Sequence, residues 1–139
     1  MFNFYKGLCG FALILTLSAC SNPLMPMDQV GEASLDDFMN AMRWKRFPMA
    51  ASYIKPEHRQ DFMDIFTPLK DIHIVDVRLI NLKPSDEDRH FETLIEMDYY
   101  LLPSVTIQTF NLEQIWEYFD GEGPEQQGFQ IITPFPDFP

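Results

Sequence analysis

Residues 90–102 read His-Phe-Glu-Thr-Leu-Ile-Glu-Met-Asp-Tyr-Tyr-Leu-Leu, and their character changes at every second position. One face of an extended chain would carry Phe91, Thr93, Ile95, Met97, Tyr99 and Leu101. The other would carry Glu92, Leu94, Glu96, Asp98 and Tyr100. Because successive side chains of a strand point to opposite faces, this alternation predicts a half-buried strand. The body must therefore contain a sheet with one covered face.

Three further segments have strand character. Ile72 to Leu82 is rich in Ile and Val, and its two largely apolar faces predict an inner strand. From Val105 to Phe119 the apolar positions change parity, so we expect a β-bulge near Thr109 to Asn111. Phe129 to Thr133 would be the last strand, since the prolines that follow cannot donate to a ladder.

The segment before the sheet has helical periodicity. Ser34 is a typical N-cap, and apolar residues share one face over residues 35–46, with Trp44 widening that face. Pro48 and Pro56 can each open a helix at its first position. We therefore expect a short second helix over residues 49–54 and a third over residues 57–67.

The order of helices first and hairpin-connected strands second predicts an α+β domain. We expect three N-terminal helices packed on a curved four-stranded antiparallel sheet. This order, with the ending Trp116-Glu117-Tyr118 and Gly128-Phe129-Gln130-Ile131, resembles the nuclear-transport-factor-2-like, or cystatin-like, superfamily. The resemblance implies a cone-shaped body with a pocket between the helices and the concave face. It also implies relatives of two kinds, isomerase-like or dehydratase-like enzymes and proteins that only bind.

The first twenty residues form a separate unit. Lys6 precedes an uncharged apolar run over residues 8–19, which is too short to span a bilayer and is typical of a secretory signal peptide. Leu17-Ser18-Ala19-Cys20 resembles the lipobox of bacterial lipoproteins. The resemblance implies cleavage before Cys20, a diacylglycerol on its thiol and acylation of its amine. Ser21 in place of Asp implies the outer membrane, facing the periplasm.

These observations divide the chain into three parts. Residues 1–19 would be the signal peptide, residues 20–33 the lipidated N-terminus and a flexible tether, and residues 34–139 a single α+β domain. Two or three acyl chains on Cys20 would hold the protein on the membrane of the cell envelope.

Charge and cysteine content exclude several functions. The formal net charge is −11, which disfavours nucleic acid, because binding to phosphates depends on Lys and Arg. Cys9 would leave with the signal peptide and Cys20 would be acylated, so no thiol nucleophile or cysteine-ligated metal remains. His58, His73 and His90 lack metal-binding spacing, and Asp86-Glu87-Asp88 indicates a solvated turn. We therefore expect no metal and no cofactor.

Two sets of residues are candidates for function. Aromatic residues and a histidine could line the pocket: Trp44, Tyr53, His58, Tyr99 and Trp116. On the polar face of residues 90–102, Glu92, Glu96 and Asp98 could form an acidic contact surface. Glu96, Asp98 and Tyr100 would instead be the acid–base groups of an enzyme if that face lined a dry pocket.

We expect a non-catalytic lipoprotein that binds an envelope protein or acts as a scaffold. Two alternatives remain: a small-molecule binding module with an aromatic pocket, and an isomerase-like or dehydratase-like enzyme. A homodimer through the sheet is compatible with each of the three.

Overall fold

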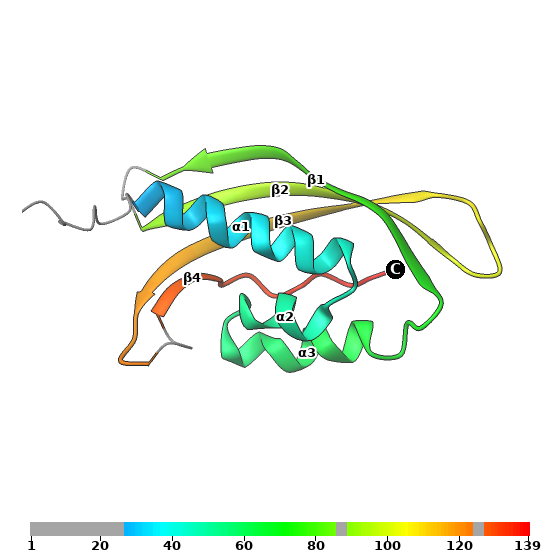
Figure 1. Cartoon of the computed structure of the whole chain (residues 1–139), viewed down its shortest axis with the longest axis horizontal. Coiled ribbons are helices and arrows are strands. Elements are labelled where there is room, and N and C mark those ends of the chain that lie inside the picture. Colours follow the sequence, from blue (N-terminus) through cyan, green and yellow to red (C-terminus); the bar gives the residue numbers. More distant parts are fainter. Residues whose placement is uncertain (1–26, 86–88, 124–126) are drawn as a thin grey trace, which may run out of the picture.

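The computed structural model describes residues 27–85, 89–123 and 127–139. Three helices precede one four-stranded sheet, with the bounds α1 Met27–Arg43, α2 Phe47–Ser52, α3 Pro56–Phe66, β1 Ile72–Pro84, β2 His90–Leu101, β3 Gln108–Asp120 and β4 Gln127–Ile131. The strands pair antiparallel in the order β1-β2-β3-β4. Figure 1 shows the sheet curving over all three helices, which lie on one of its faces. The predicted α+β fold is confirmed.

The alternation in β2 places the core as predicted. Its odd-numbered residues from Phe91 to Tyr99 are all buried, whereas the even-numbered residues between them are half-buried or exposed. β2 lies between β1 and β3, so its inward side chains meet the helices and its outward ones form the middle of the opposite face. We call that opposite face the outer face of the sheet.

β1 is an edge strand, and the prediction of an inner strand is wrong. Its pairing with β2 shifts between Ile74 and Asp76 and again between Leu79 and Asn81. Each shift inserts an extra residue, which exchanges the faces of the residues that follow. Apolar residues therefore occur on both faces without both faces being covered, and Val75 and Ile80 are 49% and 47% exposed.

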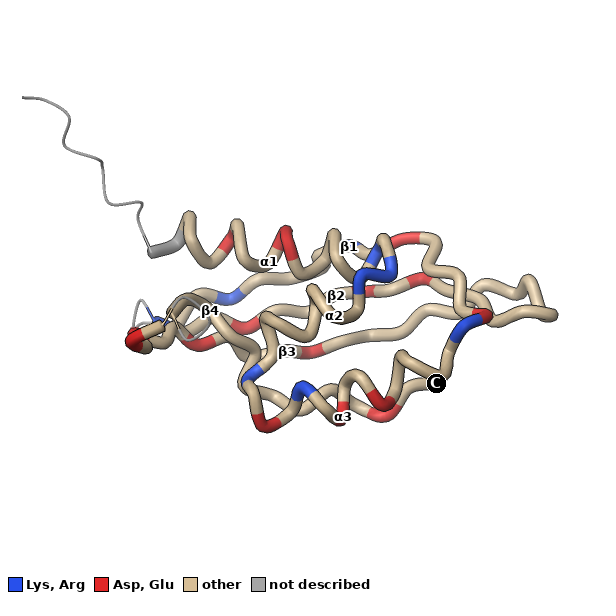
Figure 2. The backbone as a smooth tube through the Cα atoms, turned by 60° about the horizontal axis from the view of Figure 1, so that its bottom comes forward, with Lys and Arg blue, Asp and Glu red and all other residues tan. Residues whose placement is uncertain are grey.

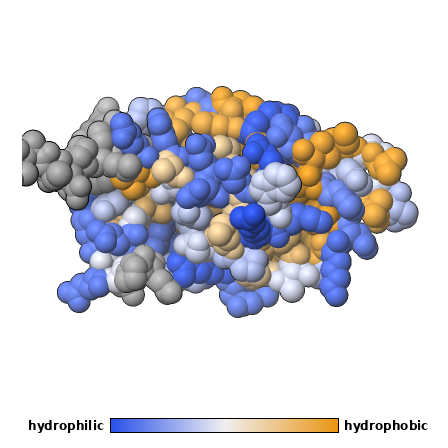
Figure 3. All heavy atoms as spheres, in the orientation of Figure 1, coloured by the Kyte–Doolittle hydropathy of each residue, from blue (hydrophilic) through white to orange (hydrophobic). Residues whose placement is uncertain are grey.

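β3 has no bulge where we expected one. It pairs with β2 without a shift from Gln108 to Glu117. The strand begins only at Gln108, so Val105 and Ile107 lie in the connection after β2. Outside a strand, odd and even positions do not correspond to the two faces of a sheet. Figure 3 shows apolar atoms over β1 and over this connection, at one end of the molecule.

α1 begins at Met27, so residues 27–33, which we had assigned to the tether, are helical. Ser34 is not its N-cap, because its hydroxyl donates to the carbonyl of Val30 inside the helix. Gly31 favoured the prediction of a tether, because glycine destabilises the middle of a helix. Here it lies on the buried face, where an added Cβ would be 2.9 Å from Cε1 of Phe91.

Aromatic side chains fill the space between the helices and the sheet. Trp116, Phe38 and Phe62 are fully buried. After β4, residues 132–139 form an extended segment that we call the C-terminal strap. It places Phe135 and Phe138 against rings of α3, β2 and β3. Within the described ranges, no helix has both the length and the apolarity needed to cross a membrane.

Candidate functional site

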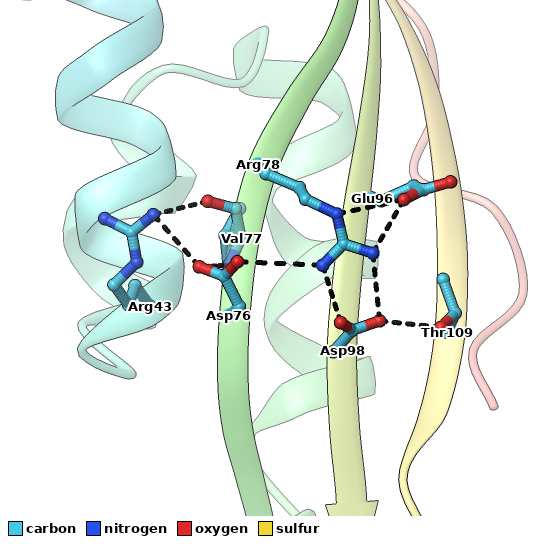
Figure 4. Close-up of polar contacts among 7 residues, drawn as sticks. All are labelled: Arg43, Asp76, Val77, Arg78, Glu96, Asp98 and Thr109. Carbon is cyan, nitrogen blue, oxygen red and sulfur yellow. Dashed lines mark hydrogen bonds and ion pairs between the residues drawn. The ribbon is translucent and has the colours of Figure 1, made fainter.

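Among the residues that the structure describes, the most connected polar group lies on the outer face, around Arg78. Its guanidinium lies between two carboxylates of β2, with Nη2 2.7 Å from Oε2 of Glu96 and Nη1 2.5 Å from Oδ2 of Asp98. Thr109 of β3 donates its hydroxyl to the other oxygen of Asp98 at 2.6 Å. Figure 4 shows these side chains reaching across three strands, and we call them the Arg78 cluster.

The cluster extends to the end of α1. Asp76 lies 3.6 Å from Arg78 and 3.4 Å from Arg43, the last residue of that helix. Arg43 also donates to the backbone carbonyl of Val77 on the free edge of β1. The ion pairs thus run from the helix layer, around the edge of the sheet and over its outer face. They tie α1 to β1, β2 and β3.

The cluster fixes the charge state of Asp98. Hydrogen bonds from Arg78, and then from Thr109, lower the pKa of this carboxyl, because both stabilise its ionised form. Hydrogen bonds to Asp98, and then to Glu96, raise the pKa of Arg78. An isomerase-like acid or base needs a carboxyl whose pKa is raised toward neutrality in a dry site. The pKa of Asp98 is lowered instead, and its carboxyl lies on the outer face of the sheet, away from the space between the helices and the sheet.

We expect Arg78→Met to destabilise the protein at neutral pH. Asp98 has a folded pKa below the unfolded value of about 3.9, so it contributes stability above that value, which is lost as the pH falls through its folded pKa. Without Arg78, Glu96 and Asp98 repel each other until they are protonated. The difference in urea midpoint between wild type and variant should therefore be larger at neutral pH than at about pH 2, well below the unfolded pKa of about 3.9.

Arg89→Met is the matched control. Among the described residues, Arg89 makes one exposed ion pair, with Asp120 on β3, and exposed contacts with Tyr118, and such exposed pairs contribute little to stability. Its midpoint should stay near that of wild type at both pH values. Equal destabilisation by the two substitutions would show that the shared position of Arg78 between two carboxylates has no special effect.

Among the described residues, the five pocket candidates do not line one common cavity. Trp44 is 68% exposed just after α1, which contradicts its expected place on the buried face. Tyr53 and Trp116 are neighbours, with ring centroids 6.5 Å apart. Tyr99 packs on Phe138 of the strap, and its hydroxyl donates to Gln108. His58 lies on α3, 3.4 Å from Glu57.

Two of these tyrosines have perturbed pKa values with a structural cause. Burial raises the pKa of Tyr53, and neighbouring Asp37, which accepts a hydrogen bond from its hydroxyl at 3.1 Å, raises it further. Burial also raises the pKa of Tyr99. Both phenols therefore remain protonated hydrogen-bond donors at neutral pH, and each already has an acceptor.

A shallow groove of about 710 Å³ crosses the outer face of the sheet. It runs from β1 over β2 and β3 to the strap, and it is lined by Asn81, Lys83, Glu92, Leu94, Asn111, Glu113, Ile115, Thr133, Pro134 and Pro136, with Thr93 and Gln114 below. The sequence predicted Glu92 as a contact residue but did not predict the groove. Leu94 and Ile115, apolar residues on otherwise polar faces, were the signal available.

The acidic surface predicted from the sequence is therefore split. Glu92 lines the groove, whereas Glu96 and Asp98 are occupied by Arg78. Arg78 was missed because the sequence does not reveal which β1 residue pairs with Glu96. Acidic residues are otherwise spread over α1, α3 and the strands (Figure 2).

Metal ligands do not come together within the described ranges. His73 stacks on Tyr100, and His90 lies 3.7 Å from Glu117. Cys20 with its lipobox and the turn Asp86-Glu87-Asp88 lie outside the described residues.

Solved structures share this arrangement although the sequence matches no family model and no curated protein. A SEC-C motif-containing protein from Psychrobacter arcticus superposes with a TM-score of 0.57 at 13% identity, covering 85% of this chain and 76% of the other. A candidate polyketide cyclase from Xanthomonas campestris pv. campestris has a TM-score of 0.52 at 9% identity, covering 76% and 90%. Agrobacterium tumefaciens VirB8 has a TM-score of 0.53 at 9% identity, covering 81% and 95%.

This chain has the nuclear-transport-factor-2-like fold. The expected fold, three helices before a curved four-stranded antiparallel sheet, is thus confirmed for the body. At these identities, the nuclear-transport-factor-2-like neighbours establish the fold and no activity.

Proposed function

We propose that this chain is a lipid-anchored protein of the bacterial envelope whose nuclear-transport-factor-2-like body binds another protein and catalyses no reaction. Leu17-Ser18-Ala19-Cys20 supports the anchor, and Ser21 supports the outer membrane, facing the periplasm. The observation that carries the choice of binding over catalysis is the position of the acids. The candidate carboxylates lie on the outer face in the Arg78 cluster, while aromatic rings fill the inner face.

The packing of the described aromatic rings between the helices and the sheet supports the same choice. Trp116 stacks on Phe91 at 5.4 Å and meets the edge of Phe38 at 5.7 Å, which closes the space below α1. Phe135 of the strap packs between Phe62 and Phe66 of α3 at 5.1 and 5.3 Å. A small-molecule site of this fold would need that space to be open.

The outer-face groove is the surface that we assign to the partner. Glu92 and Glu113 line it with one cation, Lys83, and with the apolar side chains of Leu94 and Ile115. Charge complementarity in a chain of net charge −11 favours a basic protein surface with apolar side chains at its centre. The groove is too open to enclose a small molecule.

The anchor is tested by replacing Cys20 with alanine. We expect the wild-type chain in the membrane fraction, with a lipid mass on Cys20, and the C20A variant in the soluble fraction. Cys9→Ala is the matched control, because Cys9 would be removed with the signal peptide and its replacement should not affect anchoring. Wild-type protein with an unmodified Cys20 thiol would overturn the proposed location.

The same membranes, solubilised in mild detergent, test the partner. The wild-type chain should capture one protein reproducibly, and the double variant E92K/E113K should lose it. D36K/D61K is the control, since it makes the same charge change at exposed positions of α1 and α3. Capture of the same protein by all three chains would exclude the groove, and the lack of any reproducible partner would exclude the function.

A further inference from the structure

The connection between β2 and β3, residues 102–107, is apolar and exposed. Leu102, Val105 and Ile107 are 45%, 75% and 57% exposed. Residues 99–112, which contain this connection, include no Asp, Glu, Lys or Arg, although the chain as a whole is rich in acidic residues. Figure 1 shows the connection projecting beyond the helices at one end of the molecule. We call residues 102–107 the apolar tip.

The backbone of the apolar tip is held in place while its side chains face outward. At its base, the N–H of Leu102 donates to the carbonyl of Asp71 at 3.1 Å. Within it, the hydroxyl of Ser104 accepts the N–H of Thr106 at 3.3 Å. Exposed apolar side chains gathered in one place are typical of surfaces that contact a protein or a membrane.

The exposed apolar surface continues along β1, the edge strand that begins beside the apolar tip. The first residue of β1 pairs with the last residue of β2, where the tip begins. Val75 and Ile80 are 49% and 47% exposed, and Figure 3 shows apolar atoms over β1 and over the tip. Asp76, the acid of this strand, is paired with two arginines. One long side of the molecule therefore presents apolar side chains and no unpaired carboxylate of β1.

The other end of β1 lies near the start of α1, from which the chain leads back to Cys20. Gly31 of α1 packs against Phe91, and Phe91 pairs with Pro84, the last residue of β1. The chain from Cys20 to Met27 can reach at most about 25 Å. β1 thus leads from the end of the body that a lipid on Cys20 would hold near the membrane to the apolar tip.

We propose that the apolar tip enters the lipid bilayer in which Cys20 is anchored, with β1 along the bilayer surface. This inference rests on the proposed lipid anchor and adds a second contact to it. A body standing on end above the anchor would point the tip into water, because α1 begins at the opposite end of the molecule (Figure 1). A body lying along β1 instead transfers the apolar side chains of the tip from water into hydrocarbon, which is favourable.

Two features of the fold fit this orientation. The anchor makes the contact of the tip intramolecular, so a small apolar surface is enough to hold the body on the membrane. β1 is an edge strand, so contact through its side leaves the outer face of the sheet, with its groove, open to a protein partner. The tip and the groove would therefore contact different things.

The charges around the apolar tip do not oppose contact with lipid. Lys45 donates to the carbonyl of the first residue of β1 at 3.2 Å, and Lys70 precedes Asp71, so both cations lie at the base of the tip. They balance Asp71 and Asp137, the latter next to the ring of the strap that packs on β2. Trp44, which is 68% exposed, precedes Lys45, and tryptophan is enriched at the interface between lipid and water.

A fluorescent label on the apolar tip tests the proposal in the anchored full chain. With Cys9 removed and Cys20 acylated, Val105→Cys supplies a single thiol for a polarity-sensitive dye. The chain, purified from membranes in detergent, is reconstituted into vesicles of phosphatidylcholine and phosphatidylglycerol. The emission should shift to shorter wavelength, and nitroxide groups on the lipid acyl chains should quench most of it. Asp61→Cys, at an exposed position of α3, is the matched control and should show neither effect.

A second substitution separates the tip from the dye. Ile107→Asp, added to the Val105→Cys chain, should remove most of the quenching, because a carboxylate at the tip opposes entry into hydrocarbon. Equal quenching of the two chains would mean that the dye enters the bilayer by itself, and would overturn the proposal.

The other outcomes also overturn it, and they differ in what they leave standing. Water-like emission from the Val105 label in a chain that sediments with the vesicles would leave the lipid anchor intact. A shift to shorter wavelength in native membranes but not in the vesicles would indicate an apolar pocket of another protein. Wild-type chain in the soluble fraction would overturn the anchor and this second contact together.

Discussion

Replacing Trp116 by alanine should lower the free energy of unfolding by about 3–5 kcal/mol, the usual cost of removing a buried large aromatic side chain. Trp116 is 0% exposed and contacts rings from both layers of the fold. Its indole Nε1 donates to the hydroxyl of buried Thr93 at 3.2 Å, so the substitution also leaves a polar group without its partner. Against a typical total of about 5–15 kcal/mol, a loss of this size is severe.

The other tryptophan is the control. Trp44 is 68% exposed, and Trp44→Ala should change the free energy of unfolding by no more than about 0.5 kcal/mol. Urea unfolding followed by circular dichroism compares the two without relying on tryptophan fluorescence. Similar losses for both variants would mean that Trp116 does not join the helices to the sheet as the structure indicates.

Local patterns predicted the middle of the fold well and its edges poorly. The alternation of residues 90–102 is a property of one strand with one covered face, and the structure confirms it in β2. The apolar character of β1 depends on two bulges, and a bulge is set by the partner strand. The alternation of apolar residues also led to the wrong prediction of a bulge in β3, because the residues before Gln108 do not belong to the sheet.

The candidate site shows the same limit. The sequence identified Glu96 and Asp98 as neighbours on one face, and this is correct because it follows from spacing in a strand. That Arg78 lies between them depends on the register of β1 against β2, which the sequence does not reveal. The interpretation of the two acids changes with that one contact, from acid–base candidates to ion-paired carboxylates.

The strap was the largest omission. Its prolines correctly predicted the end of strand pairing, but its two phenylalanines contribute to the core. Phe135 contacts Phe62, Phe66 and Phe110, with centroids 5.1 to 6.0 Å away. Phe138 contacts Tyr99 and Phe110, both at 4.8 Å. An extended segment without regular structure thus closes one side of the cone.

A chain that ends at Thr133 should consequently be less stable and should expose an aromatic surface. Full burial of a phenylalanine contributes about 1.5–3 kcal/mol, and both rings are partly buried, so we expect a loss of about 2–4 kcal/mol. The double variant F135A/F138A should reproduce most of it, and both chains should bind the dye ANS more strongly than wild type. Pro136→Ala keeps both rings and should behave as wild type. A shortened chain of unchanged urea midpoint would mean that the rings lie on the body without stabilising it, and the space that they fill would again be available for a ligand.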